Sequence, residues 1–381
     1  MTNPTWKIPF NRVSFGEKER TYLEEALHGS AVAGDGPFTR RCHALLEHEL
    51  GVPRVLLTTS CTHALEMAAL LLGIGPGDEV IIPAFTFVSA GNAFALRGAR
   101  PVLAEIRPDT LNLDERCLEQ IITPRTRAIV VVHYAGVACE MDTIREIASR
   151  HALPIVEDNA HGLFGAYKGQ PLGAFGALAT LSFHETKNIS CGEGGALIVN
   201  DPAYIAQAEI IREKGTDRSQ FFRGQVDKYS WVGLGSSYLP SDLLAAVLLA
   251  QLESRGRIQT RRAAIASAYR HQLAAWAAAN GVQLPHVPAG CESAHHLFYM
   301  VMPSLTARQG LIAHLRAQGI LATFHYVPLH QSAMGSALGY RPGDFPVSEQ
   351  ISDRLVRLPF YTDMSDDDIA EVVAAVHQFS F

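Results

Sequence analysis

The chain has 381 residues, a length that exceeds one ordinary hydrophobic core and predicts two domains. With 48% hydrophobic and 18% charged residues, it has the composition of a well-buried globular protein. The net charge of -6 and the lack of a basic cluster argue against a nucleic-acid-binding or membrane-surface protein. Residues 1–7 contain no apolar run, and the longest apolar stretches are too short to span a bilayer. We therefore expect a cytoplasmic protein with six reduced cysteines and no metal-ligand spacing.

Short β-rich runs alternate with helical patterns between residues 54 and 200. Helices are expected at residues 62–72, 114–122 and 141–151, and Gly75-Pro-Gly-Asp78 predicts a turn. Apolar strands that are separated by helices usually form a largely parallel sheet covered on both faces, which predicts an α/β fold. The strand candidates are residues 55–58, 79–83, 102–105, 128–133, 154–158, 179–183 and 196–200.

The pattern changes after residue 200. Residues 215–241 form a polar and aromatic stretch without clear periodicity, and a loop of that length in a compact domain is usually functional. We expect a large domain over residues 1–255 and a smaller α+β domain over residues 256–381. The helices expected here are residues 203–214, 242–255, 261–280, 307–318 and 366–379, and the strands are residues 297–302 and 322–326.

Two residues at strand ends suggest chemistry. Asp158 closes the run 154–158, and ligands gather at the carboxyl ends of strands in open α/β sheets, although Asp is also a common cap for the following turn. Lys187 follows the next strand and precedes the flexible run Cys191-Gly-Glu-Gly-Gly195. Most lysines are solvated surface cations, but a lysine removed from water loses proton affinity and can act as a nucleophilic amine.

Two further segments at strand ends could also contribute to a ligand site. Thr58-Thr-Ser-Cys-Thr62 joins a strand to a helix, where free amides favour an anion and where Ser and Thr also serve as ordinary N-caps. Pro83-Ala-Phe-Thr-Phe87 ends a strand with two aromatic residues, for which core packing is the usual explanation. An anion cradle, an aromatic face, a carboxylate and a lysine at one edge of a sheet are together what pyridoxal 5'-phosphate requires.

This combination resembles the DegT/DnrJ/EryC1/StrS family of sugar aminotransferases, from Ile8-Pro-Phe-Asn-Arg12 to Arg357-Leu-Pro-Phe-Tyr361. The resemblance implies the aspartate-aminotransferase-like fold type I, with pyridoxal 5'-phosphate as cofactor and a mostly parallel seven-stranded sheet. Within the family, the runs 133–142, 182–188, 212–216 and 218–229 resemble the members that aminate C4 of dTDP-4-keto-6-deoxy-D-glucose. This implies L-glutamate as donor and dTDP-4-amino-4,6-dideoxy-D-galactose as product, for enterobacterial common antigen or lipopolysaccharide.

The resemblance also implies roles for single residues. Lys187 would hold the cofactor as a Schiff base, Asp158 would face its pyridine nitrogen, and Phe87 would lie on its ring. His161 falls where the family places a residue near the phenolic oxygen. The phosphate would be held by Ser60, Cys61, Thr62 and Ser182.

A symmetric homodimer with shared active sites is implied as well, because in the family the segment corresponding to residues 215–241 completes the partner's site. Many members have Asn where this chain has Ser237, and because serine is shorter, its contact with the partner's phosphate is left open. Candidates for binding the nucleotide sugar are Arg218, Arg223 and Lys228, which solvated surface charge explains equally well, together with His325 and Tyr326.

The same patterns leave other functions open. The nearest is amination of a different nucleotide keto sugar, at C3 or at C4 with the opposite stereochemistry. Relatives that dehydrate their substrate replace the lysine by His, which Lys187 argues against. A nicotinamide dehydrogenase would need G-x-G-x-x-G after its first strand, and residues 58–62 lack those glycines. A non-catalytic regulatory protein on the same fold is the remaining alternative.

Overall fold

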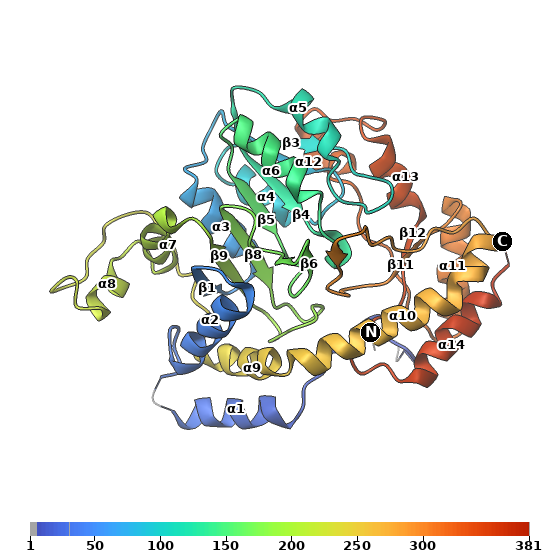
Figure 1. Cartoon of the computed structure of the whole chain (residues 1–381), viewed down its shortest axis with the longest axis horizontal. Coiled ribbons are helices and arrows are strands. Elements are labelled where there is room, and N and C mark those ends of the chain that lie inside the picture. The colour runs from blue at the N-terminus through green and yellow to red at the C-terminus, as the bar shows by residue number, and fades with distance from the viewer. Residues whose placement is uncertain (1–5, 30, 381) are drawn as a thin grey trace.

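The computed structural model describes residues 6–29 and 31–380, and its centre is a seven-stranded sheet (Figure 1). The strand order is β1-β9-β8-β5-β4-β2-β3, in which β9 is antiparallel to both neighbours and the other pairs are parallel. The sheet is therefore mostly parallel, as predicted, and each strand falls within two residues of the expected position. The strands are β1 Arg54–Thr58, β2 Glu79–Pro83, β3 Arg100–Ala104, β4 Thr126–Val132, β5 Ile155–Asp158, β8 Leu178–Ser182 and β9 Gly195–Val199.

Helices cover both faces of this sheet because its apolar side chains alternate between them. Val130 of β4 packs in the same core as α3 (Cys61–Leu71) and α4 (Ser89–Ala95). Its neighbours Ile129 and Val131 pack on the opposite face with α6. The helices of that opposite face are α2 Pro37–Leu50, α5 Leu118–Ile121, α6 Met141–Arg150 and α9 Asp242–Glu253.

The N-terminal part adds α1 (Glu17–His28), which the sequence patterns did not indicate and which packs along α9 (Figure 1). The Gly75–Asp78 turn is present as expected, since the amide of Asp78 donates to the carbonyl of Gly75 at 3.2 Å. A small sheet is formed by β6 Ala166–Tyr167, β7 Gln170–Pro171 and β10 Cys291–Glu292, and 3-10 turns lie at Glu115–Cys117, Tyr134–Gly136, Pro202–Tyr204 and Leu329–Gln331.

The C-terminal part has a core of its own. Helix α10 (Arg255–Ala279) starts six residues earlier than expected and joins the two parts, because Ile258 packs in the core of α2 and α9 while Ile265 packs in the C-terminal core. Ile8 from the start of the chain also lies in this second core. The division at residue 255 stays a prediction. The remaining elements are α11 Leu305–Ala317, α12 Ala333–Ala337, α13 Pro346–Arg354, α14 Asp366–His377 and the antiparallel pair β11 Tyr299–Val301 and β12 Leu355–Arg357.

The prediction of a strand at residues 322–326 is wrong. Only Thr323 forms a bridge there, exchanging hydrogen bonds of 3.1 and 2.7 Å with Arg357. The ladder cannot continue because Leu321 donates its amide to Ile8 instead, and the opposite position is Pro359, which has no amide hydrogen. The chain then leaves the small sheet, and Leu329 donates to the carbonyl of Ala84 beside the large one.

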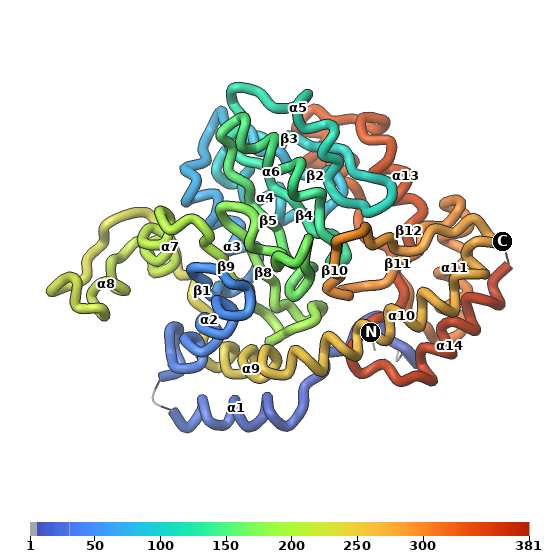
Figure 2. The backbone as a smooth tube through the Cα atoms, viewed as in Figure 1, coloured from blue at the N-terminus to red at the C-terminus, as the bar shows by residue number. Residues whose placement is uncertain are grey.

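Two expected helices are shorter than predicted, and one segment projects from the molecule. Residues 114–122 and 203–214 each open with a 3-10 turn, and the second continues as α7 (Ile205–Arg212). The segment 215–241 contains the short helix α8 (Arg218–Phe222) and extends away from the rest of the chain (Figures 1 and 2).

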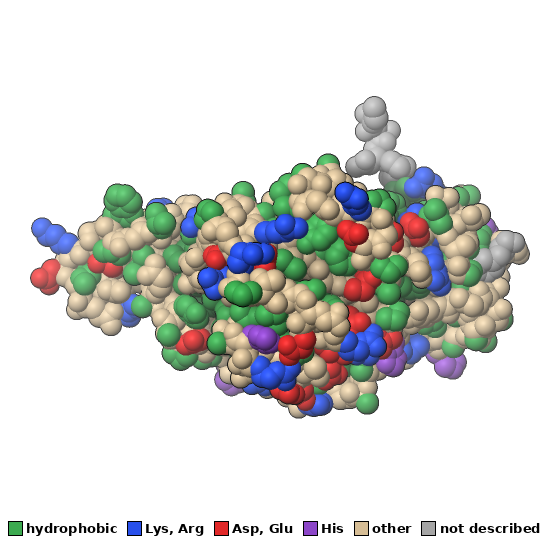
Figure 3. Space-filling view, turned by 90° about the horizontal axis from the view of Figure 1, so that it is seen from above, with side chains coloured by type: hydrophobic (Ala, Val, Ile, Leu, Met, Phe, Trp, Pro, Cys, Tyr) green, Lys and Arg blue, Asp and Glu red, His purple; other side chains and the backbone are tan. Residues whose placement is uncertain are grey.

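No helix within residues 6–29 and 31–380 is long and apolar enough to cross a membrane. On the face drawn in Figure 3, acidic and basic side chains are interspersed rather than gathered into a large patch of one sign. All six cysteines are free thiols.

Candidate active site

The carboxyl ends of β1, β2, β5 and β8 lie at the same edge of the sheet, where a cavity of about 550 Å³ opens. Parallel strands deliver the residues that follow them to one edge, which is why segments far apart in sequence meet here. The cavity is lined by Lys187 and by all the expected cofactor residues except Ser237, which are Ser60, Cys61, Thr62, Phe87, Asp158, His161 and Ser182, and also by His325 and Tyr326.

The start of α3 forms one wall. The hydroxyl of Ser60 accepts the amide of His63 at 3.1 Å, so the N-cap reading of this serine is correct. The first amides of a helix have no partner inside the helix, and the helix dipole adds partial positive charge. Gly195 packs against this turn so closely that a Cβ there would lie 2.3 Å from the carbonyl carbon of Ser60. The cavity wall at α3 is therefore built to receive an anion.

Lys187 follows β8 in a tight turn, where its amide donates to the carbonyl of His184 at 2.9 Å. Its side chain is half-buried in the cavity wall and forms no ion pair within the described part of the chain. Burial lowers the pKa of Lys187 to about 8, against the opposing pull of Cys61 and Asp158. The surface-cation reading is thus wrong, and a neutral amine is accessible near neutral pH.

Asp158 ends β5 and is 6% exposed. Burial raises the pKa of this carboxyl group. The pKa is lowered by the hydrogen bond that the carboxyl group accepts from the Ala160 amide at 3.2 Å and by the nearby Lys187. Both readings of Asp158 therefore hold, since it caps a turn and also faces the cavity. A cationic group beside it in the cavity would favour its ionised form.

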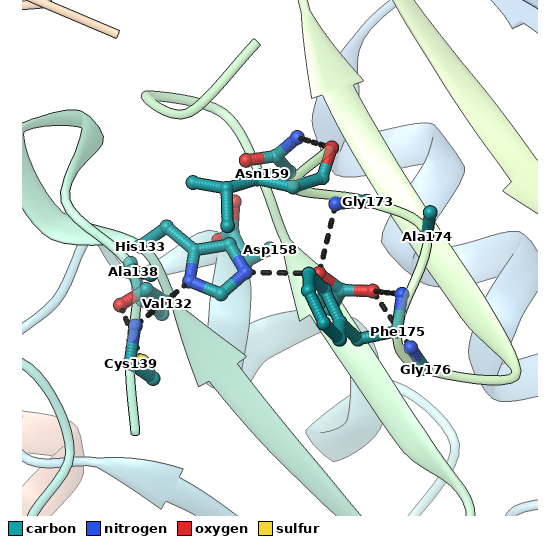
Figure 4. A network of polar contacts seen from close by, with 12 residues as sticks. Val132, His133, Ala138, Cys139, Asp158, Asn159, Gly173, Ala174, Phe175 and Gly176 are labelled. Carbon is teal, nitrogen blue, oxygen red and sulfur yellow. Dashed lines mark hydrogen bonds and ion pairs between the residues drawn. The ribbon is translucent and has the colours of Figure 1, made fainter. Parts of the chain in front are cut away.

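A buried network fixes β5 from the other face of the sheet (Figure 4). Glu157, adjacent to Asp158 but pointing to the opposite side, accepts backbone amides from Gly173, Phe175 and Gly176 at 2.7–2.8 Å. The Nδ1 of His133 accepts the amide of Cys139, so the ring proton sits on Nε2 and is donated to Glu157 at 2.9 Å. These contacts hold the end of β5, and with it Asp158, in place.

The two aromatics after β2 have different surroundings. Phe85 is 1% exposed and belongs to the core, as expected for an aromatic residue at a strand end. Phe87 is 53% exposed and lines the cavity, with its ring centroid 5.9 Å from that of Tyr326. Core packing therefore explains Phe85 and does not explain Phe87.

His161 also lines the cavity and is stacked on His296, with 4.2 Å between the ring centroids. Burial holds the pKa of both rings well below the ordinary value, so both are neutral. Nδ1 of His161 accepts the amide of Ala135 at 3.3 Å, which places its proton on Nε2. His161 can thus donate one hydrogen bond through Nε2 without carrying a charge.

Four of the sequence-predicted residues lie outside the cavity of their own chain. Ser237 and Lys228 are exposed, and Ser237 forms a backbone bridge with Glu213. Arg218 pairs with Glu213 at 3.2 Å, and Arg223 pairs with Glu209 at 2.7 Å. Within one chain these arginines are surface ion pairs, and their action on a partner's site stays a prediction.

The sequence patterns missed several residues of the cavity wall. Arg357 is the clearest example of a missed residue. It stands in the otherwise apolar run 355–360, and a charged residue in such a run was the available sign that it is buried. Others are Phe10, Asn11, Thr86, His184, Glu193 and His296, to which the sequence patterns assigned no role.

The residues present fit pyridoxal 5'-phosphate. The cavity volume lies in the range of small-molecule sites. Its wall offers a helix N-terminus for a phosphate, a buried carboxyl group, an exposed aromatic ring and an amine of lowered pKa. The close approach of Gly195 to the α3 turn explains why glycine is needed there.

Comparison with known proteins agrees with this geometry. The profile of the DegT/DnrJ/EryC1/StrS aminotransferase family matches residues 13–377. The aminotransferase TlmJ from Streptoalloteichus hindustanus is 30% identical, with a TM-score of 0.88 over 98% of this chain and 97% of that one. S. venezuelae DesV, solved with a ketimine intermediate, is 32% identical, with a TM-score of 0.87 over 98% of each chain. The PLP form of the sugar aminotransferase Spr1654 from Streptococcus pneumoniae is 27% identical, with a TM-score of 0.89 over 98% of this chain and 100% of that one.

The family match spans nearly the whole chain, and the fold agrees with solved aminotransferases from end to end. A cavity that fits the cofactor lies at the edge of the sheet where ligands of α/β folds gather. The chain belongs to the DegT/DnrJ/EryC1/StrS family and is a pyridoxal-phosphate-dependent sugar aminotransferase.

Proposed function

We propose that this aminotransferase moves the amino group of L-glutamate to C4 of dTDP-4-keto-6-deoxy-D-glucose and forms dTDP-4-amino-4,6-dideoxy-D-galactose. The observation that carries the chemistry is the single cavity in which Lys187, Asp158 and the start of α3 meet. The choice of sugar is supported by the runs 133–142, 182–188, 212–216 and 218–229. The reaction would take place in the cytoplasm and supply a surface polysaccharide such as enterobacterial common antigen.

Each residue has a distinct task in this proposal. Lys187 binds the cofactor covalently and, once released, carries a proton away from the donor's Cα as a neutral amine. Asp158 keeps the ring nitrogen protonated through its negative charge. Bound between them, pyridoxal phosphate supplies an electron sink for the carbanion that forms when the Cα proton leaves.

The remaining cofactor residues orient the ring. Phe87 covers one face of it, and His161 donates its Nε2 hydrogen to the phenolic oxygen. The phosphate is held by Ser60, Cys61 and Thr62 at the start of α3, and by Ser182. His325 and Tyr326, which line the same cavity, contact the sugar.

The active form is a symmetric homodimer in this proposal. Phe222, Trp231 and Leu234 of the projecting segment are 70%, 79% and 66% exposed, which is unusual for large apolar side chains clustered in one segment. Association of two copies would cover these residues. It would also bring Ser237, Arg218, Arg223 and Lys228 toward the partner's cavity.

The substrate is tested by incubating the enzyme with L-glutamate and, separately, with 3-keto and 4-keto isomers of dTDP-6-deoxyhexoses and with the corresponding UDP and GDP sugars. NMR of the product locates the new C–N bond and gives its stereochemistry. The reacting carbon must lie at about 3–3.5 Å in a defined orientation, so a misplaced ketone should react orders of magnitude more slowly. Faster turnover of a 3-keto sugar, or an equatorial C4 amine, would replace the proposed substrate with another nucleotide keto sugar.

A further inference from the structure

The residue that follows Lys187 is tied to the C-terminal part of the chain. Asn188 is 9% exposed, and its Nδ2 donates to the carbonyl of Ala294 at 2.7 Å and to Oε1 of Gln259 at 3.2 Å. Its Oδ1 lies 3.0 Å from Nδ1 of His296. Ala294 and His296 precede β11, and Gln259 belongs to α10, so all three partners come from outside the large sheet. Asn188 therefore links the Lys187 turn to the C-terminal part.

The hydrogen bonds define which nitrogen of His296 carries the proton. A backbone carbonyl can only accept, so the bond to Ala294 identifies the NH2 group of Asn188 and leaves Oδ1 as the acceptor. Nδ1 of His296 is therefore protonated and donates to Asn188. Burial holds the pKa of His296 well below its ordinary value, so the ring is neutral and has one N–H group. That group is used on the residue beside Lys187.

His296 is itself held in place by the chain around it. Arg262 of α10, which is 2% exposed, donates from Nε to the carbonyl of His295 at 3.0 Å and from Nη2 to that of His296 at 2.5 Å. The amide of Ala294 donates to the carbonyl of Gly136 at 2.9 Å. These bonds fix the backbone of residues 294–296 on both sides, so His296 is a firm support for Asn188.

The side chain of Lys187 has no support of this kind. Within residues 6–29 and 31–380 it forms no hydrogen bond and no ion pair. Its backbone is held on one side by its amide, which donates to the carbonyl of His184 at 2.9 Å, and on the other side by the contacts of Asn188. The backbone therefore determines where the amine can reach. A displacement of about 1 Å at a reacting group can cost about 100-fold in rate.

We propose that His296 and Asn188 are positioning residues, which hold the backbone of Lys187 so that its amine reaches the aldehyde carbon of the cofactor. This inference rests on the proposed attachment of the cofactor to Lys187 and adds how the C-terminal part supports that attachment. The ring of His296 also stacks on His161, with 4.2 Å between the ring centroids. The two contacts of His296 can be separated, because one uses Nδ1 and the other uses the face of the ring.

The inference is tested on the cofactor-free protein, without donor or sugar. His296→Phe keeps a ring against His161 and loses the Nδ1 donor. With saturating pyridoxal 5'-phosphate, stopped-flow absorbance should show that the covalent bond to Lys187 forms at least about 10-fold more slowly. Pyridoxamine phosphate has the same ring and phosphate but no aldehyde, so it reports the non-covalent contacts alone. Its Kd from calorimetry should change by less than about 3-fold, because those contacts are retained.

Two further variants separate positioning from general loss of structure. His296→Asn loses the ring but keeps an N–H donor at the same number of bonds from Cα, so it should form the covalent bond within about 3-fold of the unmodified rate. Asn188→Ala removes the acceptor of the same hydrogen bond and should be as slow as His296→Phe. Combining His296→Phe with Asn188→Ala should slow the reaction little further, since the two residues act through one contact.

The matched control is His43→Phe. His43 is 6% exposed, as His296 is, and accepts the amide of Leu57 at 2.9 Å, but it does not line the cavity. This control loses a buried imidazole hydrogen bond and should form the covalent bond within about 3-fold of the unmodified rate, because distant sites act independently.

Three results would overturn the inference: an unchanged rate in His296→Phe, an equal loss of pyridoxamine phosphate binding, or a His296→Asn variant as slow as His296→Phe. If His296→Phe does not fold, Asn188→Ala decides in its place. Borohydride reduction of the unmodified complex and mass spectrometry of its digest show which lysine is attached. Unchanged rates with the label on Lys187 refute this inference alone, whereas a label on another lysine refutes the proposed role of Lys187 and this inference with it.

Discussion

At the scale of single residues, the substitution of Lys187 is expected to have the largest effect on activity. It lines the cavity, has no acidic partner within the described residues, and has a pKa lowered to about 8 by burial. Lys187→Ala should abolish transamination while the fold is retained, because alanine removes the amine that we propose to hold the cofactor and move the proton. Borohydride reduction followed by mass spectrometry of the digest checks the assignment. A cofactor bond that is still reducible in the variant would place the covalent attachment elsewhere.

The same lysine predicts a pH dependence of stability in the cofactor-free protein. Between about pH 8 and 10.5 the folded state binds fewer protons at Lys187 than the unfolded chain does. The free energy of unfolding should therefore rise with pH across this window, by about 1–3 kcal/mol relative to a Lys187→Met variant. Urea unfolding of both proteins from pH 7 to 10.5 measures the difference. Parallel curves for the two proteins would mean that this amine is not desolvated.

How much of the site follows from sequence depends on where its residues come from. Asp158 and Lys187 were predictable because each follows a strand of one sheet, and parallel strands bring their carboxyl ends together. Arg357 and His296 were not, because they reach the cavity from the C-terminal part, and no local pattern specifies how that part docks. Their neutral or charged state also depends on burial, which only the assembled structure defines.

At the scale of elements, the network behind β5 should contribute more to stability than surface pairs do. Glu157→Gln keeps the size of the side chain. However, the carboxylate now accepts four hydrogen bonds, and the NH2 group of glutamine would face one of these N–H donors instead of accepting from it. We expect a loss of about 3 kcal/mol in the free energy of unfolding, measured by urea unfolding. Glu119→Gln, which breaks an exposed pair with Arg150, is the control and should leave the curve nearly unchanged. Equal effects of the two variants would contradict the importance assigned to the network.

The elements themselves show which patterns are reliable. The buried strands of the large sheet were predictable because short apolar runs bounded by turns have few other structures. The strand expected at residues 322–326 fails because its pairing depends on Pro359 and Ile8, partners distant in sequence. The predicted start of α10 is too late because Arg255 and Arg257 interrupt the apolar pattern, while the helix continues through them.

At the scale of the whole molecule, the cavity is a product of both parts of the chain. The large sheet provides Asp158 and Lys187, and the C-terminal part provides Tyr326 and Arg357. Helix α10 connects the two cores, so a change in its packing would alter the distance between the two walls. A cavity built at such a boundary is the usual place for a ligand site.

The proposed dimer with shared sites can be tested by a complementation experiment. Ser237 is exposed on its own chain, so Ser237→Asp should not disturb folding, but in the dimer it would place a carboxylate beside the partner's phosphate and block cofactor binding there. Lys187→Ala inactivates the site of its own chain. When both variants are co-expressed, half of the dimers are mixed, and each mixed dimer has one site with Lys187 and a partner's Ser237. Activity should return to about a quarter of the unmodified level, since the sites of a two-fold dimer are equivalent. Sedimentation must show that both variants remain dimeric. Two dimeric variants that restore no activity together would mean that Ser237 does not act across the interface.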